Sequence, residues 1–168
     1  VPFLCAYSFL CWILLSQTIS SWNSTNDYCN RLVKNYKPFL NYEKVFMLDV
    51  PAYYNGIAAF RSAVEERIFF EFGLPLEKIC FIAGSYHDSA SDSLLLVHLS
   101  DNVIEVKGNL RKTPYFSTIG GWAKSYETDE YSVNFDSTVC SYTLSFKKEI
   151  PRNSVFVYAS GDKWITAE

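Results

Sequence analysis

The first charged side chain of this 168-residue chain is Asp27. The segment before it is uncharged, and residues 3–15 are almost wholly apolar, with Ser8 as the polar interruption. A helix with one face in water shows polar residues about every 3.6 residues, and this segment shows no such spacing. Water therefore disfavours the segment unless a bilayer or a protein core covers it. The cellular compartment that follows from this is the strongest functional statement that the sequence supports.

Three interpretations of this segment are open. The apolar part is short for a membrane span, because about 15 residues rise roughly 22 Å as a helix and a hydrocarbon core is roughly 30 Å thick. Mostly small polar residues follow at positions 16–21, an order typical of a secretory signal that is cleaved after Ser20 or Ser21. A retained membrane anchor that continues through Trp22 is the alternative, and a buried core helix is the third.

We therefore expect residues 1–21 to be a signal peptide or a membrane anchor. Residues 22–168 are enough for one hydrophobic core and are expected to form a single domain. The protein is expected to be secreted, extracellular or lumenal, with a single-pass membrane anchor as the alternative. Any contact with a membrane would be made through residues 1–22.

Asn23-Ser24-Thr25 matches the acceptor pattern for N-glycosylation. In an exported chain with a cleaved signal, Asn23 would lie in a free N-terminus, whereas beside a retained anchor a bulky glycan would fit poorly. Basic residues prefer the untranslocated side of a membrane. Those that follow the apolar segment closely, and so oppose a lumenal location, are Arg31, Lys34, Lys37 and Lys44. On balance we favour export and expect a glycan on Asn23.

Composition excludes one class of partner. The net charge is −3, from 15 basic and 18 acidic residues, and the basic residues are scattered in the sequence. Nucleic-acid binding depends on clustered Lys and Arg, so we expect no nucleic-acid partner. Aromatic residues make up 17% of the chain, with 12 Tyr and 13 Phe, and such residues fill cores, interfaces and ligand pockets.

Two of the five cysteines, Cys5 and Cys11, lie in the apolar segment. Cys29, Cys80 and Cys140 remain, and in an oxidising compartment two of these three are candidates for a disulfide. Their spacing does not say which two would pair. The sequence has no Cys-x-x-Cys, so neither a thiol-redox role nor a structural zinc site is expected.

Two helices are expected early in the chain. Asp27 is expected to cap a short helix that ends at about Tyr36. Asn55 is expected to cap a longer helix through Phe72, with apolar residues on one face, and Gly73 stops it. The run KVFMLDV, residues 44–50, lies between them and is predicted to be a strand.

The second half of the chain is predicted to consist of strands. They are expected at residues 78–85, 93–99, 103–106, 115–119, 131–135, 139–146, 154–159 and 163–166. The first two are expected to form a hairpin across a polar turn. This order indicates the α+β class: one antiparallel sheet of five to seven strands with one long helix packed on one face.

The densest group of reactive side chains is Ser85, His87 and Asp88. These are the residue types of a hydrolase triad, but neighbours in sequence point in different directions and Gly-x-Ser-x-Gly is absent. A polar turn is the favoured interpretation. His87, His98 and Asp88 could in principle ligate a metal, yet a hairpin would more naturally pair His98 with residues near 78–82. We therefore expect no catalytic residue, no metal and no cofactor.

A strand, a long helix and then Gly84-Ser85 after the next strand are faintly similar to SEA domains over about residues 44–99. These are extracellular ferredoxin-like modules, and some cleave themselves at a Gly-Ser bond. Tyr86-His87-Asp88 stands where such domains have a run of β-branched residues, so the similarity implies no self-cleavage and we assign no family.

These observations favour a protein that works by binding. The first hypothesis is a non-catalytic interaction module that contacts another protein through an aromatic sheet face or edge. The second is a carrier of a small apolar ligand in a cavity between helix and sheet. If the apolar segment is retained, an accessory subunit of a membrane complex is a further possibility. A hydrolase that uses Ser85, His87 and Asp88 is the least favoured.

Overall fold

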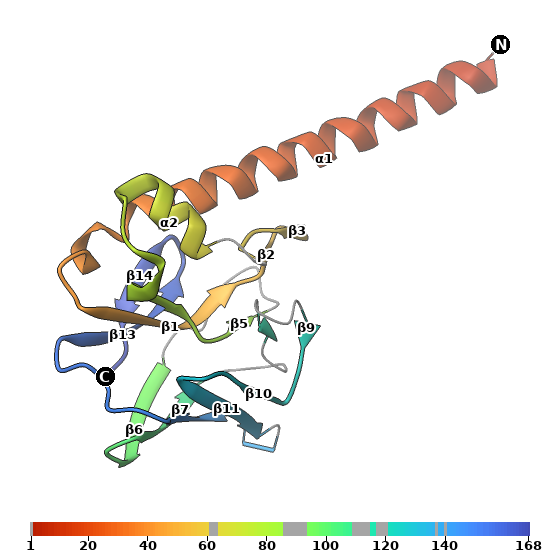
Figure 1. Cartoon of the computed structure of the whole chain (residues 1–168). Helices are drawn as coiled ribbons and strands as arrows, with labels where there is room; N and C mark the ends of the chain where they lie inside the picture. The colour runs from red at the N-terminus through yellow and green to blue at the C-terminus, as the bar shows by residue number, and fades with distance from the viewer. Residues whose placement is uncertain are drawn as a thin grey trace.

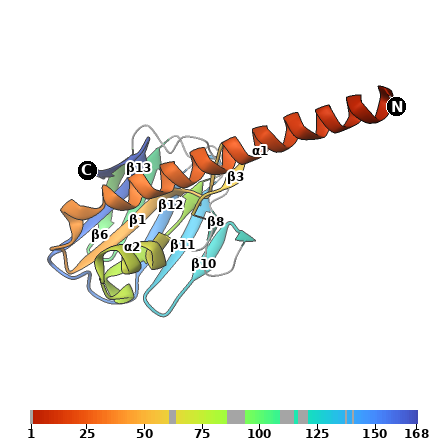
Figure 2. The same cartoon turned by 90° about the horizontal axis from the view of Figure 1, so that it is seen from above.

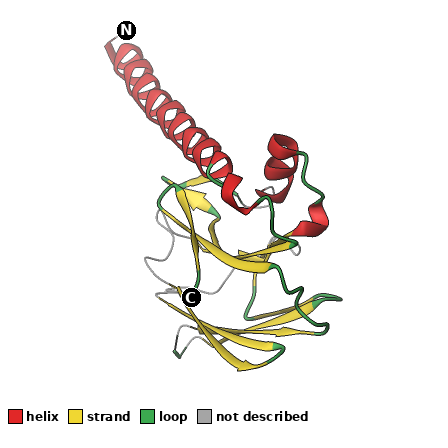
Figure 3. Ribbon diagram, turned by 90° about the vertical axis from the view of Figure 1, so that its left-hand side faces the viewer, coloured by secondary structure: helices red, strands yellow, loops and turns green. Residues whose placement is uncertain are grey.

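The computed structural model of the chain describes residues 2–60, 64–85, 94–108, 115–116, 121–136, 138–139 and 141–168. The folded part has three layers: helices, a mixed sheet and an antiparallel sheet (Figure 3). The class is therefore α+β, as predicted. One helix projects far beyond the layers and carries the N-terminus away from them (Figure 1).

That helix is α1 (Pro2–Lys34), which is 33 residues long and joins the apolar segment to the domain without a break. At about 1.5 Å per residue it spans about 50 Å. The expectation that a helix begins at Asp27 is wrong, because Asp27 lies well inside α1. A short 3-10 helix, η1 (Lys37–Phe39), follows α1.

The mixed sheet is the middle layer. Its strands run in the order β14 (Lys163–Thr166), β13 (Ser154–Ser160), β1 (Lys44–Pro51), β5 (Gly84–Ser85), β8 (Tyr115–Phe116) and β9 (Gly121–Trp122), and β4 (Ile79–Phe81) also pairs with β1. Strand β1 is parallel to β13, β4 and β5. The antiparallel pairs of this sheet lie outside that parallel centre.

Strand β1 is buried on both faces. From Val45 to Pro51 every residue is buried. Val45 and Met47 pack into the core beneath the helices, whereas Phe46 and Leu48 pack into the core beneath the antiparallel sheet. A parallel strand that is covered on both sides has a continuous apolar sequence instead of an alternating one, which explains the run KVFMLDV.

The antiparallel sheet has the strand order β10 (Ser125–Glu127), β11 (Tyr131–Asp136), β12 (Ser141–Phe146), β7 (Val103–Gly108) and β6 (Leu94–Ser100). Its strands alternate between buried and exposed residues, so one face packs on the mixed sheet. Two buried tyrosines connect the sheets: the Tyr142 hydroxyl donates to Leu48 O at 2.8 Å, and the Tyr131 hydroxyl donates to Phe81 O at 3.3 Å.

The last turns of α1 form part of the domain core. Tyr28, Cys29 and Leu32 are each at most 3% exposed, and Tyr36, in the turn that follows α1, is fully buried. The Trp164 indole on β14 donates to Leu32 O at 2.8 Å, which satisfies a carbonyl that the end of the helix leaves without an intrahelical partner. A view from above shows this half of α1 crossing the sheets while the other half extends beyond them (Figure 2).

The expected long helix of residues 55–72 is shorter than predicted. Helix α2 (Val64–Phe72) forms its second half, and residues 61–63 lie outside the described part. The first half contains a hairpin of β2 (Tyr53–Tyr54) and β3 (Ile57–Ala58). The expected apolar face is partly correct, because Phe60, Val64 and Ile68 are fully buried.

The strands are divided between two sheets instead of forming one. The 3-10 helix η2 (Leu76–Lys78) leads into β4, which pairs with the mixed sheet, whereas β6 lies in the antiparallel sheet. The hairpin expected between residues 78–85 and 93–99 is therefore wrong. The other predicted strands are found within the described residues; of the one expected at residues 115–119, only residues 115–116 are described, and they form β8.

Two neighbouring residues test the three-layer arrangement. Met47→Ala and Leu48→Ala each remove a fully buried side chain from a different core, so each is expected to lower the free energy of unfolding by about 2–5 kcal/mol. Leu95→Ala is the control, because Leu95 is 55% exposed and the change should stay within about 0.5 kcal/mol. Denaturant unfolding of the full chain in mild detergent measures all three. A near-neutral result for Met47 or Leu48 would contradict burial of both faces of β1.

Candidate functional site

The end of the domain where α1 leaves the folded layers is the candidate functional site. The N-terminal part of α1 is long and apolar enough to cross a membrane, and its apolar window is not buried in the domain. Large exposed apolar side chains include Phe3, Phe9, Trp12 and Leu15, and Trp22 is the last of them along α1 at 57% exposed. From Phe3 to Trp22 the helix rises about 30 Å, the thickness of a hydrocarbon core.

The polar second half of this segment makes internal hydrogen bonds. Ser16 Oγ donates to Ile13 O at 2.8 Å, and Thr18 Oγ1 donates to Leu14 O at 2.8 Å. A hydroxyl that bonds to a carbonyl of the preceding turn no longer needs water, so its cost in hydrocarbon is small. These bonds lower the cost of placing Ser16 and Thr18 in hydrocarbon and so favour a membrane span through Trp22.

The β2–β3 hairpin contacts α1 where its exposed part ends. Thr25 is 3% exposed, and its Oγ1 lies 2.9 Å from Ser21 O and 3.0 Å from Tyr54 O. Asn55 Nδ2 donates to Ser24 Oγ at 3.2 Å. The rings of Tyr28 and Tyr54 stack with centroids 4.1 Å apart and an interplanar angle of 3°. These contacts fix the hairpin to one turn of helix.

The hairpin turn has the geometry that its sequence requires. Asn55 and Gly56 have φ values of +48° and +73°, the left-handed conformation of both central residues in a type I′ turn. The Asn-Gly pair between Tyr53-Tyr54 and Ile57-Ala58 is the strongest short hairpin signal. The sequence interpretation missed it by assigning Asn55 as a helix cap, although this signal could have revealed the contact with α1.

The predicted glycosylation residue lies at this same boundary. Asn23 is exposed and directly follows Trp22 on the continuous helix α1. A retained anchor would therefore place the Asn23 side chain against the lipid headgroups.

The polar group of Ser85, His87 and Asp88 is only partly described. Ser85 ends β5, beside Pro51 at the carboxyl end of β1, and His87 and Asp88 lie outside the described residues. A Cβ at the neighbouring Gly84 would lie 2.8 Å from Val50 O, so only glycine fits there without a shift of the backbone. The close packing of β5 against β1 therefore accounts for the glycine at position 84.

Within the described ranges, no group of three His, Cys, Asp or Glu side chains is arranged to hold a metal ion. His98 lies on β6, in a shallow surface depression beside Asp101 and Glu149.

Cys29 and Cys80 are free, buried thiols. Cys29 lies in the core beneath the helices and Cys80 in the core between the sheets, so the mixed sheet separates them. A disulfide between these two is therefore not formed, and Cys140 lies outside the described residues. Burial raises the pKa of the Cys29 thiol, and it raises the pKa of Cys80 to about 12.

The aromatic residues considered for a ligand cavity pack on one another. The Phe46 ring lies 5.1 Å from that of Phe146 and 4.9 Å from that of Phe156. A pocket of about 160 Å³ beside Phe46 and Phe146, at the edge of this core, is below the several hundred Å³ of a typical small-molecule site. These contacts favour a filled core at this position over a ligand cavity.

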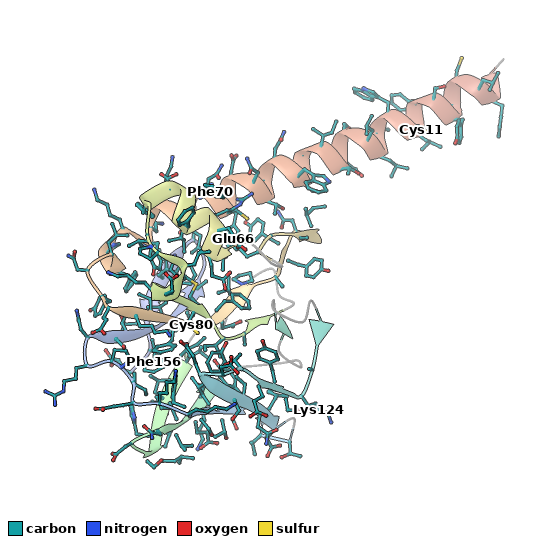
Figure 4. All side chains as sticks on the ribbon, viewed as in Figure 1. Cys11, Glu66, Phe70, Cys80, Lys124 and Phe156 are labelled. Atoms are coloured by element: carbon teal, nitrogen blue, oxygen red, sulfur yellow. The ribbon has the colours of Figure 1, made fainter. Side chains whose placement is uncertain are left out.

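Exposed apolar side chains on the described surface of the domain include two pairs. On α2, Phe69 is 39% exposed and Phe70 81% exposed, and their rings meet edge to face at 5.3 Å. Figure 4 shows Phe70 on α2. On the edge strand β6, Leu95 and Leu99 are both more than half exposed.

Four buried tyrosines in the two cores have raised pKa values. Burial raises the phenol pKa above its ordinary value in Tyr28, Tyr36, Tyr131 and Tyr142. For Tyr28 and Tyr142, the charge of the buried Asp49 adds to this effect. All four hydroxyls therefore stay neutral and protonated at physiological pH.

Comparison of the chain with protein-family models, with curated proteins and with solved structures found no match.

The buried phenols and Cys80 predict a loss of stability at alkaline pH. The ordinary pKa values are 9.0 for a thiol and 10.0 for a phenol. Above them the unfolded chain releases these protons while the folded protein keeps them. The contribution of these groups to the free energy of unfolding should therefore be constant below about pH 9. Above the ordinary pKa of each group it should fall by about 1.4 kcal/mol per pH unit for that group. Denaturant unfolding between pH 8 and 11 measures this slope.

Tyr142→Phe is the matched variant for this experiment. It loses the hydrogen bond to Leu48 O, about 1 kcal/mol at every pH, and it removes one titrating group, so its alkaline slope should be shallower. An equal slope in the variant and the parent chain would contradict a buried, protonated Tyr142.

Proposed function

We propose that this chain is a membrane-anchored, non-catalytic interaction module in which α1 is retained as the anchor. The observation that carries the proposal is the continuity of α1, because one helix supplies both an exposed apolar segment of membrane length and three buried core residues, Tyr28, Cys29 and Leu32. The internal hydrogen bonds of Ser16 and Thr18 support a span that continues to Trp22.

We further propose that the domain lies on the untranslocated side of the membrane. Arg31, Lys34 and Lys37 follow the proposed span within about 15 residues, the range in which basic residues set orientation. The free thiols of Cys29 and Cys80 are in keeping with a reducing compartment. This topology replaces export as the favoured location.

The partner class that we propose is another membrane-associated protein. Gln17 places an exposed carboxamide within the proposed span, and such groups form hydrogen bonds between transmembrane helices. The exposed pair Phe69 and Phe70 lies on α2, which packs beside α1. Large exposed aromatic side chains are typical of protein contacts. An accessory subunit of a membrane complex combines both features.

Charge within the span tests the anchor. The double variant Leu10→Arg with Leu14→Arg should insert poorly, because each Arg near the centre of a span costs about 2.5–3.5 kcal/mol. The parent chain should stay in the membrane fraction after alkaline carbonate extraction, whereas the variant should be released. The same change at the exposed domain residues, Leu95→Arg with Leu99→Arg, is the control and should leave membrane retention unchanged. Release of the parent chain by carbonate would contradict the anchor.

Glycosylation tests the side of the membrane. The variant Asp136→Thr creates a second acceptor at Asn134, an exposed residue of β11 in the sheet farthest from α1. In microsomes neither Asn23 nor Asn134 should gain a glycan, so glycosidase treatment should not change the mobility of either chain. A glycan on Asn134 but not on Asn23 would place the domain in the lumen and show that the bilayer shields Asn23.

A further inference from the structure

We infer that the β2–β3 hairpin, residues 53–58, lies in the lipid headgroup layer and holds the domain at a fixed orientation to the bilayer. The inference rests on the proposed anchor and adds a second membrane contact to it. The ligand is the headgroup and interfacial region of a bilayer.

The level of the hairpin along α1 is the first argument. If the hydrocarbon ends at Trp22, the headgroup region covers about the next 5–7 Å of the helix, or roughly four residues. Asn55 in the turn bonds to Ser24, and Tyr54 bonds to Thr25, so both lie level with that region. Figures 1 and 2 both show the hairpin beside α1 where the helix leaves the domain.

The direction of the hairpin is the second argument. Its turn contacts Ser24, whereas Tyr54, one residue from the turn, stacks on Tyr28 one helical turn farther from the N-terminus. At its base, the Ala59 N–H donates to Ala52 O at 2.9 Å. The turn therefore points along α1 toward the proposed span, and Asn55 and Gly56 are exposed there.

The chemistry of the hairpin is the third argument. Residues 53–58 (YYNGIA) carry no charge, and Tyr53, Tyr54 and Ile57 are each only partly buried. Tyrosine and tryptophan are enriched where a membrane protein meets the headgroups, because an apolar ring and a polar tip suit that layer. Trp22 adds an exposed indole at the same level of α1.

The attachment of the hairpin is rigid enough to transmit orientation. One helix alone leaves a domain free to tilt on the membrane, whereas a second contact beside it restrains the tilt. The two hydrogen bonds between α1 and the hairpin, together with the Tyr28–Tyr54 stack, hold the hairpin on the helix.

Depth-dependent fluorescence quenching tests the inference on the full chain in phosphatidylcholine vesicles. A genetically encoded fluorescent amino acid replaces Ala58, an exposed residue of β3. Quenching is measured with nitroxide lipids that carry the nitroxide either on the headgroup or deep in the acyl chain. The same amino acid at Leu10 reports the span, and at Asn134 it reports the part of the domain farthest from α1.

The Ala58 probe is expected to be quenched by the headgroup nitroxide at least about threefold more than the Asn134 probe, because interfacial residues reach 5–10 Å into the boundary layer. The Leu10 probe should be quenched most by the deep nitroxide. Equal quenching at Ala58 and Asn134, with deep quenching at Leu10, would overturn the hairpin contact and leave the anchor in place. Weak quenching at all three positions would overturn both.

Discussion

The domain depends on covering both faces of β1. Its residues alternate between two separate cores, Val45 and Met47 on one side and Phe46 and Leu48 on the other, so neither face tolerates water. The antiparallel sheet covers one face, and Tyr131 and Tyr142 fix it there by donating to backbone carbonyls of the middle layer. The other face needs a helical cover, which α2, a helix of 9 residues, is too short to supply alone.

Helix α1 supplies the missing cover, so its exposed apolar segment and the domain form one structural unit. Tyr28, Cys29 and Leu32 fill the core above the mixed sheet, and Trp164 and Asp162 hold the end of the helix through Leu32 O and Arg31. Because these contacts fix the last turns of α1, the exposed part of the helix leaves the domain in a defined direction. The apolar segment is a rigid extension of the core (Figure 2).

Local sequence patterns predicted the strands and the α+β class, because alternation and apolar runs depend on burial of single residues. They failed where one residue type serves two purposes. Asparagine is common both as a helix cap and in type I′ turns. At Asn55 the following residue is Gly56, which adopts a positive φ and so favours the turn. The division into two sheets was not predicted; it reflects the burial of β1 on both faces. Strand partners depend on distant segments, so β4 and β6 could not be assigned from their neighbourhood in sequence.

The candidate site, where α1 leaves the domain, could likewise be predicted only in part. The apolar segment was visible in the sequence, but the length of a possible span depended on whether Ser16 and Thr18 need water. Their hydrogen bonds to carbonyls of the preceding turn reduce that need. The hairpin contact could not be read from the chain, since Ser24 and Asn55 are brought together only by the packing of α1 on the mixed sheet. If α1 is the proposed anchor, the packing of its last turns on the domain and the hairpin contact together limit the angle between bilayer and domain. A partner would then meet the exposed surfaces of α2 and β6 within that limited range of angles.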